Sequence, residues 1–92
     1  MQGISILIPV YNYPVEDLVK NLSSQLSSSG KPGEIIILDD GSEFLFQTSN
    51  QQFSKLPFVV YSQHEINQGR LATRNHLASL AAYDFLLFID AD

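Results

Sequence analysis

The residues best suited to chemistry are two pairs of aspartates, each directly after an apolar run. Asp39 and Asp40 follow four aliphatic residues, and Asp90 and Asp92 follow five apolar residues. Because residues two apart in an extended segment project to the same side, the carboxylates of Asp90 and Asp92 would converge. Such oxygen ligands suit Mn²⁺ or Mg²⁺, with water and phosphate oxygens completing the coordination. The simpler alternatives are a solvated acidic segment for Asp90 and Asp92, and an Asp-Gly turn at residues 40–41.

Two arginines could position an anionic ligand. Arg70 and Arg74 lie four residues apart near the start of a predicted helix, and both helix N-termini and guanidinium groups suit phosphate or carboxylate partners. The alternative is a solvated helix face on which Arg74 pairs with an aspartate at a neighbouring strand end. The two interpretations are compatible, because an arginine can orient a ligand-binding aspartate.

The remaining candidates are an aromatic residue and two histidines. Tyr11 follows the first predicted strand, where its ring could contact a nucleobase. His64 and His76 have no partner at metal-ligand spacing, which favours a structural role for both. The glycine patterns of the dinucleotide-binding fingerprint and of the P-loop are absent from the sequence.

Four segments are predicted to form the strands that carry these residues. Residues 35–38 form a continuous apolar run, and residues 4–8 are apolar except for Ser5; both patterns are typical of strands that are buried on both faces of a parallel sheet. The run at residues 35–38 is expected to be central, and Pro9 is expected to stop the first strand. Further strands are predicted at residues 58–62 and 83–89.

The connecting segments favour helices. Pro14 suits a first helical position, and apolar residues then recur at spacings of three and four through Leu26. Residues 70–82 are helical by propensity, and residues 44–53 predict a short irregular helix. Alternating strands and helices predict an α/β fold with a mainly parallel four-stranded sheet and flanking helices. Ligands of such sheets bind beyond the carboxyl ends of the strands, where the aspartates lie.

Composition limits the class of protein. Ninety-two residues suit one small domain, and a net charge of -5 argues against a general nucleic-acid surface. The absence of cysteine fits a reducing compartment, and no apolar run approaches the roughly 18 residues of a membrane span. We therefore expect a soluble, cytoplasmic chain. The strand at residues 83–89 has no covering helix after it, which predicts an exposed edge that drives self-association.

Four motifs, in order along the chain, resemble those of the family 2 glycosyltransferases, whose N-terminal halves adopt the GT-A fold. Ile-Leu-Ile-Pro-Val-Tyr-Asn at residues 6–12 is similar to the opening strand and turn of the family, and Asp-Asp-Gly-Ser at residues 39–42 to its aspartate motif. Residues 67–75 resemble its Asn-x-Gly, Ala-x-Arg-Asn segment, and residues 90–92 its Asp-x-Asp motif. The resemblance implies that residues 1–92 form the N-terminal nucleotide-binding part of a Rossmann-like GT-A domain.

The same resemblance implies a role for each matched residue in nucleotide binding. Pro9 and Tyr11 would border the nucleotide pocket, and Arg74 would help to arrange it. Asp39 would hydrogen-bond the nucleobase, usually uracil, with Asp40 beside it. The sequence leaves open which of these two aspartates faces the base.

At the other strand end, the resemblance implies a metal site. Asp90 would contact the ribose or the surroundings of the metal, and Asp92 would ligate Mn²⁺ or Mg²⁺ on the diphosphate. Family members transfer a sugar from a nucleotide-sugar donor to a glycan or lipid acceptor with inversion, and their general base lies after the Asp-x-Asp motif. We therefore expect a donor half-site without a catalytic residue, inactive alone. The parent enzyme would build polysaccharide or glycolipid at the cytoplasmic face of a membrane.

Three other classes compete with this interpretation. A nucleotidyltransferase with a related sheet would carry a basic, glycine-rich turn after the first strand, where this chain has Pro-Val-Tyr-Asn at residues 9–12. A phosphoacceptor receiver domain would carry its acidic pair after the first strand and a lysine after a fifth. A non-catalytic nucleotide-binding or interaction domain with the same fold remains the main alternative.

Overall fold

A four-stranded, fully parallel sheet forms the centre of the molecule, and the computed structural model describes residues 2–91 of the chain. The strand order is β3-β2-β1-β4. The strands are β1 Ile4–Val10, β2 Gly33–Asp40, β3 Val59–His64 and β4 Phe85–Phe88. The helices are α1 Glu16–Ser29, α2 Phe44–Gln51, the short 3₁₀ helix η1 Gln52–Lys55, and α3 Arg70–Leu80. This arrangement confirms the predicted α/β fold with a parallel sheet.

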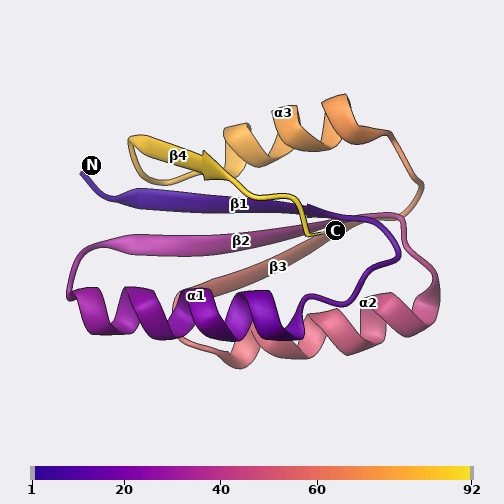
Figure 1. Ribbon diagram of the computed structural model, residues 1–92. Helices are drawn as coiled ribbons and strands as arrows, with labels where there is room; N and C mark the ends of the chain where they lie inside the picture. The colour runs from indigo at the N-terminus through magenta and orange to yellow at the C-terminus, as the bar shows by residue number, and fades with distance from the viewer. Residues whose placement is uncertain (1, 92) are drawn as a thin grey trace.

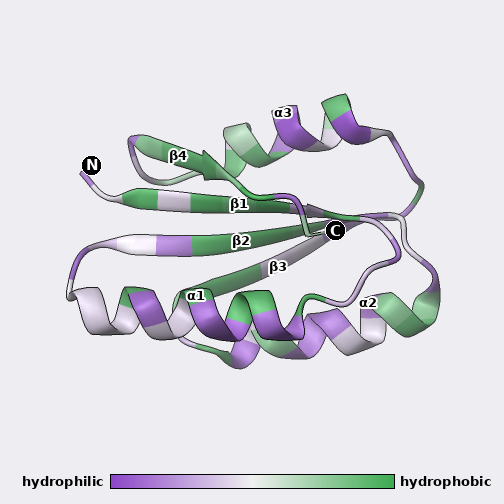
Figure 2. Cartoon of the chain, in the orientation of Figure 1, coloured by the Kyte–Doolittle hydropathy of each residue, from purple (hydrophilic) through white to green (hydrophobic). Residues whose placement is uncertain are grey.

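The two central strands, β1 and β2, are also the most apolar. Figure 2 shows apolar residues along most of both strands, and Leu7, Ile8, Ile35 and Ile37 are fully buried. Strands with a neighbour on each side and a helix layer on each face exclude water from all sides, which explains why β-branched and leucine residues fill them. The prediction that the run at residues 35–38 forms a central strand is therefore confirmed.

The helices cover the sheet from both faces, with α1 and α2 on one side and α3 on the other (Figure 1). The larger core cluster joins alternate residues of β1 and β2 to α1, η1 and β3. The smaller cluster packs Leu7, Ile36 and Leu38 against Leu77 of α3. Because the connection through α3 returns across the opposite face, the strand order reverses between β1 and β4. In α/β sheets, such a reversal opens a crevice at the carboxyl ends of the strands.

Pro9 does not end the first strand, contrary to the prediction, since β1 continues to Val10. The backbone oxygen of Leu7 accepts a hydrogen bond from Ile89, so the backbone N–H and C=O groups of odd-numbered β1 residues face β4. The pairing of β1 with β4 stops at Leu7 and Phe88. Pro9 therefore has no strand opposite its nitrogen, and its missing N–H costs no ladder hydrogen bond.

Several predicted boundaries were also wrong. The first helix begins at Glu16 instead of Pro14, and the third strand begins at Val59. Phe58 has a φ of 72°, which is incompatible with a strand. The helix expected at residues 44–53 is present as α2 followed by η1, and its first part is more regular than predicted. The last helix ends at Leu80, two residues before the predicted end.

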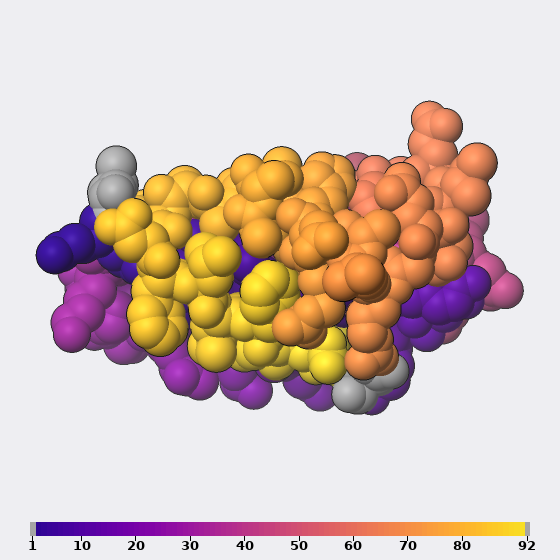
Figure 3. Space-filling view, turned by 90° about the horizontal axis from the view of Figure 1, so that it is seen from above, coloured from indigo at the N-terminus to yellow at the C-terminus, as the bar shows by residue number. Residues whose placement is uncertain are grey.

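The strand β4 is shorter than predicted and forms one edge of the described sheet. The backbone N–H of Tyr83 donates to the side-chain hydroxyl of Ser5 instead of to a backbone oxygen of β1, so the strand pairing starts only at Phe85. Figure 3 shows β4 (yellow) beside α3 (orange) on the molecular surface, and the Phe85 side chain is 64% exposed. Self-association through this strand stays a prediction. Within residues 2–91, the helices are too short and too polar to cross a bilayer.

Candidate functional site

A cavity of about 250 Å³ lies at the carboxyl ends of the strands, where the strand order reverses. This volume is slightly below the roughly 300–1,000 Å³ typical of small-molecule sites. Segments far apart in sequence form its wall: Pro9 and Val10 at the end of β1, Tyr11 and Tyr13 after it, Asp40 from β2, Asn67, Gly69, Arg70 and Thr73 around the start of α3, and Asp90 and Ala91 after β4. The fold thus brings residues of all four sequence motifs to one place.

The first wall of the cavity is formed by the end of β1 and the segment that follows it. Pro9 and Tyr11 both line the cavity, and their role at a nucleotide pocket stays a prediction. The Tyr11 side chain is 54% exposed, and Tyr13, which the sequence did not single out as a ligand contact, is 42% exposed. Two exposed aromatic rings beside a cavity give flat apolar surfaces against which a planar ring can stack.

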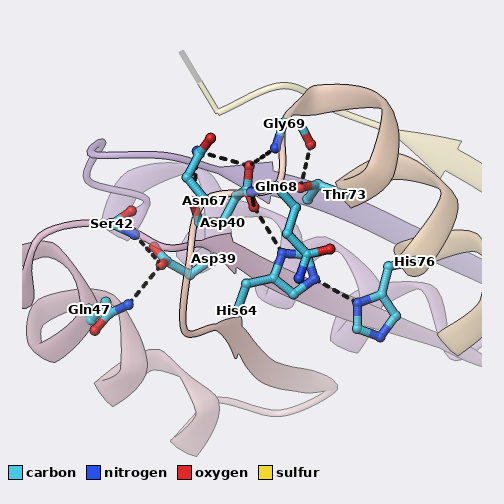
Figure 4. Close-up of polar contacts among 10 residues, drawn as sticks. All are labelled: Asp39, Asp40, Ser42, Gln47, His64, Asn67, Gln68, Gly69, Thr73 and His76. Atoms are coloured by element: carbon cyan, nitrogen blue, oxygen red, sulfur yellow. Dashed lines mark hydrogen bonds and ion pairs between the residues drawn. The ribbon is translucent and has the colours of Figure 1, made fainter.

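Asp40, the last residue of β2, is 5% exposed, and its carboxylate accepts four hydrogen bonds (Figure 4). Its Oδ1 accepts from Nδ1 of His64 at 2.9 Å and from the N–H of Gln68 at 2.8 Å. Its Oδ2 accepts from Nδ2 of Asn67 at 3.0 Å and from the N–H of Gly69 at 2.9 Å. The carboxylate therefore ties β2 to β3 and to the turn that precedes α3.

These hydrogen bonds hold the pKa of the Asp40 carboxyl below its usual value. Burial acts in the opposite direction and raises the pKa, because it disfavours the charged form. The hydrogen bond from His64, together with those from the backbone of Gln68 and Gly69, favours the anion and outweighs burial. Asp40 is therefore a buried, fully hydrogen-bonded anion at neutral pH.

The two histidines extend this network away from the cavity. Because the Asp40 carboxylate can only accept, Nδ1 of His64 carries the proton between them. Nε2 of His64 lies 2.8 Å from Nδ1 of His76, and the two rings are nearly parallel with centroids 5.0 Å apart. The structural role expected for both residues is consistent with these contacts, but their partnership across twelve residues was not predicted.

Asp39 points to the opposite side of the sheet from Asp40, as expected for neighbours in a strand. Its Oδ2 accepts hydrogen bonds from the N–H of Ser42 at 2.8 Å and from Nε2 of Gln47 at 3.2 Å (Figure 4). Its Oδ1 is buried and accepts from no group within the described part of the chain. Burial, and secondarily the negative charge of Asp39, raises the pKa of Tyr61 to about 12. Asp39 is not part of the cavity wall.

The opposite wall carries Asp90, whose side chain is 43% exposed. Its carboxylate lies 3.9 Å from the Arg70 guanidinium and 3.8 Å from that of Arg74. Arg74 also lies over the ring of Phe88, 4.3 Å from its centroid. The pairing of Arg74 with an aspartate at a neighbouring strand end, which the sequence suggested as the alternative to a ligand contact, is present. Two cations beside one exposed carboxylate leave this wall suited to a ligand that carries further negative charge.

The predicted metal ligands are only partly within the described residues. Asp90 lines the cavity, whereas Asp92 lies outside residues 2–91. Within that range, no group of three or more His, Cys, Asp or Glu side chains is placed to hold a metal ion. The exposed oxygens of Asp90 are hard ligands of the type that Mn²⁺ and Mg²⁺ prefer. The donor chemistry at this strand end therefore fits the predicted ion, and the metal itself stays a prediction.

Comparison with known proteins identifies the family. The family model described as "Glycosyl transferase family 2" matches residues 5–92. The chain belongs to this family. It is 33% identical, over all of its length, to the poly-beta-1,6-N-acetyl-D-glucosamine synthase of Staphylococcus epidermidis. It is 36% identical over 97% of its length to a poly(ribitol-phosphate) beta-glucosyltransferase of Bacillus spizizenii.

Solved structures agree with this assignment. The S. aureus protein TarS, solved for residues 1–349 in complex with UDP, matches the whole chain with a TM-score of 0.72 and 27% identity. The sheet and its flanking helices thus have the Rossmann-like GT-A architecture. The chain covers 28% of that TarS structure, 22% of the S. epidermidis synthase and 14% of the B. spizizenii transferase. It therefore spans less than a third of the length of these relatives.

Proposed function

We propose that this chain supplies the donor half-site of a glycosyltransferase that moves a sugar, with inversion, from a UDP-sugar to an acceptor hydroxyl of a glycan or lipid. The observation that carries the proposal is the convergence of all four family motifs on one cavity at the reversal of strand order. A structural relative, TarS, was solved with UDP. Two relatives are named for polymeric products or substrates, which supports a role in polysaccharide synthesis.

In this proposal the buried wall of the cavity binds the nucleobase. Tyr11 offers an exposed ring for stacking, and Asp40 offers the carboxylate that faces the cavity. All four acceptor positions of Asp40 are filled, but one of its donors is the exposed amide of Asn67. Exchange of that amide for the imide N–H of uracil would keep four hydrogen bonds on the carboxylate and would give up the second bond of the Asn67 amide, to the backbone oxygen of Asp40. We therefore assign the base contact to Asp40, and the expected contact from Asp39 stays a prediction.

The exposed wall of the cavity would bind the ribose and diphosphate. Asp90 and Asp92 would hold Mn²⁺ or Mg²⁺, and the ion, when bound, would neutralise charge that develops on the leaving nucleoside diphosphate. Arg70 and Arg74 keep Asp90 oriented and add positive charge to the same wall. The general base that activates the acceptor would come from outside residues 1–92, so this half-site alone would not transfer sugar. We also propose that the whole protein works at the cytoplasmic face of a membrane.

Calorimetric titration of the full-length protein with UDP, with and without Mn²⁺, tests this assignment. We expect binding that requires Mn²⁺ and that weakens at least tenfold in an Asp92→Ala variant, because the ion would lose its ligand. Glu65→Gln is the matched control. It removes an exposed carboxylate from the loop before α3 that is not part of the cavity wall, and it should leave the affinity unchanged.

Other outcomes of the titration separate the alternatives. Failure of the wild-type protein to bind UDP or any other nucleoside diphosphate with Mn²⁺ present would favour a non-catalytic interaction domain. Binding of a different nucleoside diphosphate instead of UDP would support the proposed donor site and would change only the base assigned to it. Binding of UDP that is equally tight without metal would contradict the metal assignment alone.

A further inference from the structure

The segment at residues 11–15, between β1 and α1, provides both aromatic rings of the cavity wall. It forms neither strand nor helix, and Tyr11 and Tyr13 are both more than 40% exposed. Exposed loops have few apolar contacts to fix their backbone, so they are normally among the least ordered parts of a protein. Its last residue, Val15, is buried in the larger core cluster, so polar contacts must fix the exposed part at residues 11–14.

The first of these contacts comes from Ser42, in the turn between β2 and α2. Its hydroxyl oxygen accepts a hydrogen bond from the N–H of Asn12 at 2.8 Å, and Oδ1 of Asn12 in turn accepts from the N–H of Glu43 at 2.7 Å. Asn12 has a φ of 49°, a left-handed conformation that asparagine tolerates better than most residues. Ser42 is itself placed by the hydrogen bond from its N–H to Asp39. These contacts fix the turn directly after Tyr11.

The second contact comes from Asn50 of α2, which is only 1% exposed. Its Nδ2 donates to the backbone oxygen of Tyr13 at 2.7 Å, and its Oδ1 accepts from the N–H of Val15 at 3.1 Å. A single buried amide thus binds the backbone on both sides of Pro14. Such a two-point contact fixes both the position and the orientation of the backbone that carries Tyr13.

We propose that Ser42 and Asn50 are positioning residues, which hold Tyr11 and Tyr13 at the cavity wall before the nucleotide arrives. Neither residue lines the cavity, so each acts only through the segment at residues 11–15. A nucleotide that meets an already ordered wall does not lose affinity to the cost of ordering that wall. This inference rests on the proposed function, because it assumes that the nucleotide binds against the two tyrosines.

Amide hydrogen exchange of the protein without ligand tests the first half of the inference. We expect Ser42→Ala to speed exchange at the Asn12 amide and Asn50→Leu to speed exchange at the Val15 amide, because each variant removes the acceptor of that N–H. Ser42→Thr keeps a hydroxyl and should restore slow exchange. Asn21→Leu, on the exposed side of α1, is the matched control for Asn50→Leu. Unchanged protection at both amides would overturn the inference.

A double-mutant cycle on UDP affinity, measured on the full-length protein with Mn²⁺, tests the second half. Ser42→Ala alone should weaken UDP binding about tenfold. In a Tyr11→Ala background, the same substitution should have little further effect, because the ring that Ser42 positions is gone. If Ser42→Ala weakened UDP binding equally with and without the Tyr11 ring, or did not weaken it at all, the positioning role would be overturned and the proposed function would stand. Failure of the wild-type protein to bind UDP would instead overturn the proposed function.

Discussion

The strands β2 and β4 each present an aspartate to the same cavity, but the two carboxylates are held in opposite ways. The Asp40 side chain is 7% exposed and accepts four hydrogen bonds of 2.8 to 3.0 Å. Asp90 is 43% exposed, and its arginine partners stand 3.8 and 3.9 Å away. One carboxylate is part of the folded framework, whereas the other is held by charge and is open to solvent.

This difference suits the two parts of a nucleotide. A base is recognised by hydrogen-bond geometry, which requires a wall that does not move, and the buried network around Asp40 provides one. A diphosphate with its ion carries charge and water, and an exposed carboxylate between two arginines can adjust to both. The stabilising hydrogen bonds are concentrated at the Asp40 end, whereas the Asp90 end contributes little to stability, so substitutions can separate the two ends.

The largest expected difference concerns the free energy of unfolding. Asp40→Ala should lower it by about 3 kcal/mol or more, because several buried donors lose their acceptor at once. Asp90→Ala should change it by no more than about 0.5 kcal/mol, since exposed ion pairs add little. Urea unfolding of the two variants measures both values. Equal losses of unfolding free energy in the two variants would show that Asp40 does not stabilise the fold more than Asp90 does.

A smaller effect is expected in acid, again at the buried end. A carboxyl group whose pKa is lower in the folded than in the unfolded protein adds stability above the unfolded value, near 3.8, and loses it as the pH falls through the folded value. The Asp40 carboxyl is such a group. The free energy of unfolding of the wild type should therefore fall more steeply below about pH 4 than that of Asp40→Asn. Parallel curves for the two proteins would show that the Asp40 network does not favour the anion.

Much of the fold was predictable because buried parallel strands have a simple pattern. The apolar run at residues 35–38 can only be buried between helix layers, and the structure places it there. The course of the chain at Pro9 was not predictable in the same way. Whether proline breaks a strand depends on which neighbour its nitrogen faces and where that neighbour ends, and both are properties of the assembled sheet.

The candidate site was predictable by position but not by orientation. The motifs placed Asp39 and Asp40 at a strand end, yet only the packing of α3 decides that Asp40 faces the cavity. Asn67 and Gly69 were recognised only as parts of a motif, since their contacts with Asp40 span more than 25 residues. Asn50 gave no signal at all, because a polar residue in a weakly periodic helix normally faces solvent.

The smallest expected effect concerns the pKa of Tyr61. It tests whether the negative charge of Asp39 acts only near the end of β2. Tyr61 has its pKa raised to about 12, first by burial and second by the negative charge of Asp39. Asp39→Asn removes the charge but not the burial, so the pKa of Tyr61 should fall by only a fraction of a unit and stay above 10. Ultraviolet absorbance of the phenolate during alkaline titration measures the shift, and Tyr61→Phe identifies this signal among the four tyrosines.

The same titration carries a consequence for stability with a definite sign. A phenol whose pKa is raised on folding adds stability below the unfolded value of 10.0, and this stability is lost as the pH rises towards 12. The wild type should therefore lose more stability than Tyr61→Phe between these two pH values. Asp90→Asn, at the open end of the cavity, should leave the Tyr61 titration unchanged. A shift as large as that of Asp39→Asn would show that the two strand ends share one electrostatic environment.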